Sequence, residues 1–311
     1  MIFKMTKSRK LAYLALLATS VIWGLSPPVI KYSLNYISPA TFLFYRFLFT
    51  SLILLVPFVI KLLKVKPKLN DLPIYLLLGF LCTPLNLYLW FVGLQKTTAV
   101  DATLISIVSP ILVIAGGVLF LQERITKIER IGIILTFAGT IMTLIQPIVE
   151  SGGKIGQNVF GNILVFLGAV AWAIFTILAK KYSKRIDSFL LSSSSFFLGL
   201  ILIIPLVFLE GNLKPAAHIA YFSQNFSSFL GIVFMVIFGS VIAYYAYIYG
   251  VSKIEASEAT IFTYLQPVFA IPVSILFLKE SVSLPFWIGA ILIIVGVFVC
   301  EQRSPIFRRN R

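Results

Sequence analysis

Charged side chains are scarce in this sequence, and the groups that most enzymes use for chemistry are nearly absent. Only 12% of the 311 residues are charged, and the chain has a single histidine, His218. It contains no H-E-x-x-H pair for zinc, no nucleophile elbow, no aspartate-rich cluster for Mg²⁺ and no P-loop. These absences argue against an enzyme and against a pump that binds ATP itself. We expect neither a metal ion nor a cofactor.

Cysteine is equally rare. The two cysteines, Cys82 and Cys300, both lie inside apolar runs. Their spacing is typical of neither a zinc site nor a disulfide framework. We interpret both as small apolar packing residues.

Apolar residues make up 59% of the chain, more than a soluble domain of this length could cover. They form runs of about 20 residues, the length that crosses a bilayer as a helix. The runs do not alternate as barrel strands would. The first run lacks a clear cleavage site, so we interpret it as a retained helix rather than a signal peptide. The sequence therefore predicts an all-α polytopic membrane protein with ten transmembrane helices, at 11–30, 38–60, 73–94, 99–121, 128–146, 160–179, 188–209, 227–249, 257–278 and 284–301.

Positive charge is concentrated on one set of span ends. The formal charge is +15, and 20 of the 26 Lys and Arg residues lie in the two terminal segments and in every second loop. A nucleic-acid binder would gather such residues on a soluble face instead. By the positive-inside rule we expect both termini in the cytoplasm, a cytoplasmic (inner) membrane location and no nucleic-acid partner. The other loops hold only Lys31, Lys96, Lys154, Lys214 and Lys279.

The second half of the sequence repeats the first. "VGLQKTTAVDATLISIVSPILVIAGGVLFLQE" from Val92 aligns without a gap with "YGVSKIEASEATIFTYLQPVFAIPVSILFLKE" from Tyr249. We expect two five-helix repeats, over 1–150 and 151–311. Because five is odd, the second repeat enters the membrane inverted, as in many secondary transporters. A duplicated scaffold without a transport role remains the alternative.

Several motifs together carry a family resemblance. They are the Trp-Gly of "VIWGLSP", the "SPATFLFYRF" segment that contains Arg46, and the repeated "LFLQE" and "LFLKE" endings. The chain resembles the drug/metabolite transporter superfamily, in particular its EamA-type exporters, over nearly its whole length. The resemblance implies a permease with a central cavity between its halves that works by alternating access. In the second half Ser192 to Ser195 stand where the first half has Arg46, so we expect the two gates to differ.

Spans four and nine carry matching stripes of small and polar residues at helical spacing, each with a proline, Pro110 or Pro267. Such a stripe packs helices closely or lines a polar path, and both interpretations stay open. Each proline removes a helical hydrogen bond, which suits a kink, a polar site or both. Spans three and eight add aromatic residues, of which Tyr247 and Tyr249 fit an interfacial belt. The candidate substrate path comprises Trp23, Ser26, Asn86, Tyr88, Trp90, Ser106, Ser109, Trp172, Thr176, Tyr244, Tyr245, Thr263 and Gln266.

Four further residues are candidate gate or structural elements: Pro27, Arg46, Pro110 and Pro267. Arg46 lies about a third of the way into span two, where its side chain could snorkel toward the outer surface. It could hold carbonyls freed at Pro27 and Pro28, or a substrate carboxylate. Asp101 and Glu258 align with each other in the first turns of spans four and nine. We interpret them as helix caps rather than proton-coupling groups.

We therefore expect a secondary transporter that exports small metabolites, such as amino acids, related amphipathic compounds or drugs. A nucleotide-sugar or phosphate-ester exchanger of the same superfamily would need several cations at mid-span, and only Arg46 is available. A channel would need a filter-like loop or a charged ring, which the sequence lacks. The expected partners are a small-molecule substrate and the lipid bilayer, with the chain a monomer or a homodimer.

Overall fold

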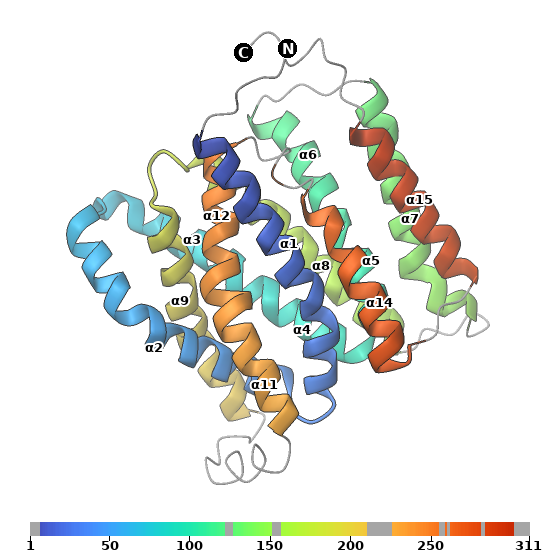
Figure 1. Ribbon diagram of the computed structural model, residues 1–311, viewed down its shortest axis with the longest axis horizontal. Helices are drawn as coiled ribbons and strands as arrows, with labels where there is room; N and C mark the ends of the chain where they lie inside the picture. Colours follow the sequence, from blue (N-terminus) through green and yellow to red (C-terminus); the bar gives the residue numbers. More distant parts are fainter. Residues whose placement is uncertain are drawn as a thin grey trace.

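The computed structural model describes residues 7–121, 127–150, 157–209, 226–254, 259, 262–280 and 284–301, and these form a bundle of helices without a strand (Figure 1). The first half contains α1 (Lys7–Leu34), α2 (Pro39–Val65), η1 (Leu69–Asp71), α3 (Leu72–Phe80), η2 (Leu81–Leu85), α4 (Asn86–Lys96), α5 (Ala99–Ser106), α6 (Val108–Leu121) and α7 (Lys127–Glu150). The second half contains α8 (Gln157–Lys181), α9 (Ser188–Leu209), α11 (Phe226–Phe234), η3 (Met235–Ile242), α12 (Ala243–Lys253), η4 (Phe262–Leu265), α14 (Gln266–Leu278) and α15 (Leu284–Glu301).

The helices have the length and apolarity of membrane spans. Within the described ranges, seven helical segments are long and apolar enough to cross a bilayer, and three shorter apolar helices accompany them. The shorter ones are Arg130–Thr143, Gln266–Leu278 and Trp287–Gly296. Together they occupy the positions of the predicted spans, so the expected all-helical, polytopic membrane fold is confirmed.

Helices of the first half pack mainly on helices of the second half, and these pairs correspond to one another. α1 packs on α12 and α14, and α8, which holds the same position in the second half, packs on α4 and α6. α2 packs on α9, and α7 lies beside α15 at one edge of the bundle (Figure 1). Each helix of one half therefore meets, in the other half, the partner that a two-fold relation would give it.

Glycine allows the closest helix crossings. A Cβ on Gly93 of α4 would lie 2.7 Å from the carbonyl oxygen of Gly161 on α8. A Cβ on Gly139 of α7 would lie 2.7 Å from the carbonyl oxygen of Gly289 on α15. Both distances are too short for any side chain, so these backbones touch only because the residues are glycines.

Four of the spans are interrupted, in two matching pairs. Spans three and eight each contain a π-helical segment, η2 with Pro84 and η3 with Gly239 and Ser240. Spans four and nine change near the aligned prolines: α5 ends at Ser106, four residues before Pro110, and η4 gives way to α14 at Gln266, next to Pro267. A proline frees the carbonyl one turn before it, and a π segment shifts the helical register. In η3 the Gly239 carbonyl accepts from Trp23 Nε1, and in η4 the Phe262 carbonyl accepts from Ser20 Oγ.

Lysine side chains bind the exposed carbonyls where two helices end. Lys31 Nζ donates to the carbonyl oxygens of Leu94 at 2.9 Å, in the last turn of α4, and of Thr97 at 2.6 Å, just after it. Lys180 Nζ donates to the Ile254 carbonyl oxygen at 2.5 Å, after the last turn of α12. A lysine at a helix C-terminus satisfies unpaired carbonyls and complements the helix dipole. Lys31 and Lys180 therefore play equivalent roles in the two halves, each satisfying carbonyl groups at a helix C-terminus.

Candidate functional site

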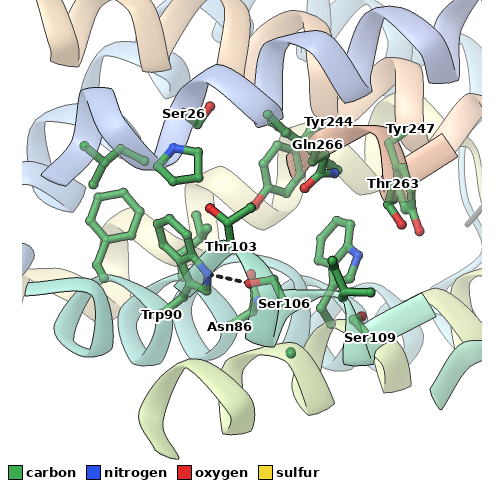
Figure 2. A pocket seen from close by; sticks show the side chains of 18 of the residues that line it. Ser26, Asn86, Trp90, Thr103, Ser106, Ser109, Tyr244, Tyr247, Thr263 and Gln266 are labelled. Carbon is green, nitrogen blue, oxygen red and sulfur yellow. Dashed lines mark hydrogen bonds between the residues drawn. The ribbon is translucent and has the colours of Figure 1, made fainter. Parts of the chain in front are cut away.

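A cavity of about 140 Å³ lies among the interrupted helices near the middle of the bundle. Figure 2 shows Asn86, Trp90, Ser106 and Ser109 on one side of it, and Ser26, Tyr244, Tyr247 and Gln266 on the other. The side chains that line it come from α1, α2, α4, α5, α6, α8, α12 and α14, with η3 and η4. They are Trp23, Ser26, Pro27, Ile30, Arg46, Asn86, Leu87, Trp90, Phe91, Thr103, Ser106, Ile107, Ser109, Pro110, Ala169, Trp172, Met235, Tyr244, Tyr247, Thr263, Gln266 and Pro267.

Most of the residues predicted for a substrate path lie around this one cavity. The structure brings together Trp23, Ser26, Asn86, Trp90, Ser106, Ser109, Trp172, Tyr244, Thr263 and Gln266, with Pro27, Arg46, Pro110 and Pro267. Their part in transport remains a prediction.

Three predicted path residues do not line the cavity. Tyr245 is 41% exposed and packs against Phe189 and Tyr249. Thr176 is fully buried beneath the cavity wall, where its hydroxyl pairs with the Tyr247 hydroxyl at 3.2 Å. Tyr88, which aligns with Tyr245 in the repeat, likewise stands off the cavity. One residue along a helix turns a side chain by about 100°, so neighbours of lining residues point elsewhere.

The expectation that Tyr247 belongs to an interfacial belt is wrong. The Tyr247 side chain is 1% exposed and lines the cavity. It belongs to an aromatic wall in which the Trp23 and Trp172 rings meet edge to face, with centroids 5.3 Å apart. Tyr244 and Tyr247 pack against both indoles at centroid distances between 5.0 and 5.7 Å. Such contacts fix bulky rings in place and give the cavity a rigid apolar side.

The polar groups of the cavity wall are mostly held by other protein atoms. Trp90 Nε1 donates to Ser106 Oγ at 3.0 Å (Figure 2), and Ser106 Oγ donates to the Ala102 carbonyl oxygen at 2.7 Å. Asn86 Nδ2 donates to the Gly168 carbonyl oxygen at 2.8 Å, joining α4 to α8. These bonds orient the side chains that face the cavity.

Ser109 is the exception. Its side chain is only 4% exposed, it lines the cavity, and its hydroxyl has no hydrogen-bond partner among the described residues. A buried hydroxyl without a partner costs free energy, about 1–3 kcal/mol. The Ser109 Oγ is itself covered by protein atoms, so this cost falls within the wall of the cavity.

Arg46 is the only charged residue among the described residues that line the cavity. Its Nε donates to Ser240 Oγ at 2.8 Å and its Nη2 to the Gly239 carbonyl oxygen at 3.4 Å, both in the π-helical segment η3. The Gly239 carbonyl also accepts from Trp23 Nε1 at 3.1 Å. The guanidinium lies 5.9 Å from the Phe91 ring centroid and 5.8 Å from that of Tyr244, within cation–π range.

This arrangement corrects two expectations for Arg46. The side chain does not snorkel to the surface, because it is 1% exposed and its bonds hold it across the bundle. The backbone group that it binds is Gly239 of the opposite half, and not a carbonyl freed at Pro27 or Pro28. In the matching place of the other half, Thr83 Oγ1 of η2 donates to the Ser195 carbonyl oxygen on α9 at 2.5 Å. A cation is therefore present at only one of two related contacts.

A carboxylate that does not line the cavity ties the two halves together. Glu280, just after α14, accepts hydrogen bonds from the backbone N–H groups of Ala99 at 2.8 Å and Val100 at 3.0 Å. Thr98 caps the same helix, because its Oγ1 accepts from the Asp101 backbone N–H at 2.9 Å. Asp101 lies in the first turn of α5, the position where a carboxylate complements the dipole. Glu258, its predicted counterpart, lies outside the described residues.

Several lining residues were not among the predicted site residues. Phe91, Leu87, Ile30 and Met235 are apolar, and composition does not distinguish a cavity wall from a core. Thr103 did carry a signal, since it belongs to the same helical stripe as Ser106 and Pro110. No group of three or more His, Cys, Asp and Glu side chains that could hold a metal ion occurs in the part of the chain that the structure describes.

Comparison with known families identifies this helical cavity protein as a transporter. The EamA-like transporter family matches residues 10–145 and 159–300, most of both halves, and the chain belongs to this family. The resemblance inferred from its motifs is thereby confirmed.

Several relatives match nearly the whole chain, and a solved structure shares its fold. The chain is 26% identical over 292 residues to an uncharacterized transporter of Archaeoglobus fulgidus, covering 94% of this chain and 98% of the relative. It is 28% identical to the uncharacterized transporter YetK of Bacillus subtilis strain 168, covering 95% and 88%, and 25% identical to the uncharacterized inner membrane transporter YedA of Escherichia coli K12, covering 94% and 91%. One crystal structure shares its fold, with a TM-score of 0.68 at 16% identity over 93% of this chain and 96% of that chain.

Proposed function

We propose that this transporter is a secondary carrier that exports small amphipathic metabolites, amino acids or related compounds, through its central cavity. The observation that carries the proposal is the cavity itself, which is lined by residues of both halves and combines aromatic rings with polar side chains. Concave, largely apolar sites with a few placed polar groups are typical of small-molecule binding. Residues from both halves line it, so a rocking motion of one half against the other would expose it to alternate sides.

The repeat supports this mechanism. We propose that residues 1–150 and 151–311 form two inverted five-helix units, in keeping with the exchanged packing of α1 and α8. We further propose that both termini face the cytoplasm, because 20 of the 26 basic residues lie on that side under this topology. The chain would act as a monomer or homodimer in a cytoplasmic membrane.

Other modes of transport have less support. An exchanger of nucleotide sugars or phosphate esters would carry at least two negative charges into the cavity, and a single cation lines it. A channel would require a continuous polar passage, whereas the Trp23 and Trp172 rings form part of an apolar wall of this cavity.

Substitutions that fill the cavity with larger side chains test the proposal. Ser109→Leu and Gln266→Leu each add apolar bulk to its wall, so we expect efflux of a transported solute to fall at least tenfold with unchanged expression. Val268→Leu is the matched control, because Val268 lies on α14 close to Gln266 and is 63% exposed on the outer surface of the bundle. The solute would be found by comparing internal metabolite pools of cells with and without the protein. Unchanged efflux in both cavity variants would place the path elsewhere.

A further inference from the structure

The cavity contains one fixed positive charge that no acidic side chain offsets. Arg46 is 1% exposed, and no Asp or Glu is among the described residues that line the cavity. Burying a cation without an anion is costly. The polar bonds to η3 and the faces of Phe91 and Tyr244 reduce that cost, but they do not neutralise the charge.

We propose that Arg46 binds the carboxylate of a small organic monoanion whose ring-sized apolar body fills the cavity. The inference rests on the transport function proposed above and names the substrate class of that site. It also separates ligands that resemble one another, because a carboxylate has a charged partner in this cavity, whereas an ammonium meets only aromatic faces and neutral acceptors.

The guanidinium is suited to this role. It has five N–H donors, and the bonds to Ser240 Oγ, the Gly239 carbonyl and the Tyr244 hydroxyl use three of them. Arginine binds carboxylates through paired, charge-assisted hydrogen bonds that are stronger than neutral ones. Ser240 and Gly239 hold the side chain across the bundle, so little conformational entropy is lost when an anion binds.

The rest of the cavity suits the body of such a molecule. Its volume of about 140 Å³ is close to that of an engineered cavity of about 150 Å³ that binds benzene. The Trp23, Trp172 and Tyr244 rings provide flat apolar surface, where a substrate ring can stack. A doubly charged phosphate ester finds neither a second cation nor enough donors here.

Binding of three matched ligands to the purified full-length protein in lipid nanodiscs tests the proposal. The ligands share a phenyl ring and a two-carbon linker: 3-phenylpropionate has only the carboxylate, phenylalanine has carboxylate and ammonium, and phenethylamine has only the ammonium. We expect 3-phenylpropionate to bind at least tenfold more tightly than phenethylamine, with phenylalanine between them. Equal affinity for the three ligands, tighter binding of the amine, or no binding at all would overturn the proposal.

Variants test whether Arg46 causes the preference for the carboxylate ligand. Arg46→Gln should abolish the preference for 3-phenylpropionate, and Arg46→Lys should keep part of it, since lysine retains the charge without the planar fork. Arg130→Gln, which removes an exposed arginine from α7, is the matched control. A folded Arg46→Gln protein that keeps the full preference would overturn the proposal. If Arg46→Gln does not fold, the wild-type ligand series still decides.

The test also separates this inference from the transport function. Efflux of a cationic or uncharged solute that Ser109→Leu blocks would uphold the transporter and remove the carboxylate specificity. Tight binding of 3-phenylpropionate without any efflux would uphold the carboxylate site and overturn the transport function.

Discussion

Individual side chains in this bundle differ in whether the protein satisfies their hydrogen bonds. Asn86 and Ser109 both line the cavity and are almost fully buried. Asn86 donates to the Gly168 carbonyl on a neighbouring helix, whereas the Ser109 hydroxyl has no partner among the described residues. The first residue therefore holds helices together, and the second leaves a free-energy cost within the wall of the cavity.

Removing the two polar groups should have opposite effects on stability. Asn86→Ala should lower the free energy of unfolding by about 1 kcal/mol, the net worth of a typical hydrogen bond. Ser109→Ala should leave it unchanged or raise it, because an unpaired buried hydroxyl is lost. Thermal unfolding of both variants in nanodiscs without ligand measures the difference. A loss of stability in Ser109→Ala as large as in Asn86→Ala would show that the hydroxyl is bonded after all.

At the scale of elements, the sequence predicted the spans well and their interruptions only in part. The aligned Pro110 and Pro267 announced the breaks in spans four and nine. The π-helical segment around Gly239 and Ser240 contains no proline, so nothing local marked it. Arg46 binds the Gly239 carbonyl of this segment, so the sequence could not predict the partner of Arg46.

The repeat alignment was a better guide to the cavity than residue chemistry. Trp90 aligns with Tyr247, and both line the cavity; Tyr88 aligns with Tyr245, and neither does. The alignment pairs equivalent positions correctly, but it does not show which way a pair faces. That direction depends on how the helices of the two halves pack, information that no single segment of the sequence contains.

The contact between Glu280 and α5 should stabilise the bundle in graded steps. Its two carboxylate oxygens accept from the Ala99 and Val100 N–H groups, and bonds to a charged group are worth about 1.5–3 kcal/mol each. We expect the melting temperature to fall from wild type to Glu280→Gln, which keeps one acceptor oxygen, and further to Glu280→Ala. Lys64→Met, which removes an exposed charge in the last turn of α2, is the control. Equal melting temperatures in all four proteins would contradict the cap.

At the scale of the whole molecule, one half supplies the charge of the cavity and the other half positions it. Arg46 belongs to α2 of the first half, and the π-helical segment that binds it belongs to the second. A second contact runs from the second half to the first, because Glu280, just after α14, binds the N-terminus of α5. A motion that separates the halves must change at least one of these contacts, so under the proposed mechanism substrate binding and gating share the same boundary.

We expect the membrane potential, and not a proton gradient, to drive the proposed transport. No carboxylate or histidine lines the cavity in the described part of the chain, so no group there is suited to carry a proton at neutral pH. Efflux of 3-phenylpropionate from loaded proteoliposomes should therefore accelerate when the vesicle interior is made negative with valinomycin and a potassium gradient. An imposed pH gradient without a potential should have little effect. A rate that follows the pH gradient and ignores the potential would require proton coupling.

The uncompensated charge of Arg46 also bears on how a cell would use such a carrier. Because Arg46 stays with the protein, a carried monoanion takes its own charge across the bilayer. A potential of 100 mV, negative inside, favours its exit by about 2.3 kcal/mol. That sustains a concentration ratio of roughly fiftyfold, higher outside, with no ATP and no cotransported ion. Under the proposed carboxylate transport, the membrane voltage alone would keep such a monoanion low in the cytoplasm, and depolarisation would remove that gradient.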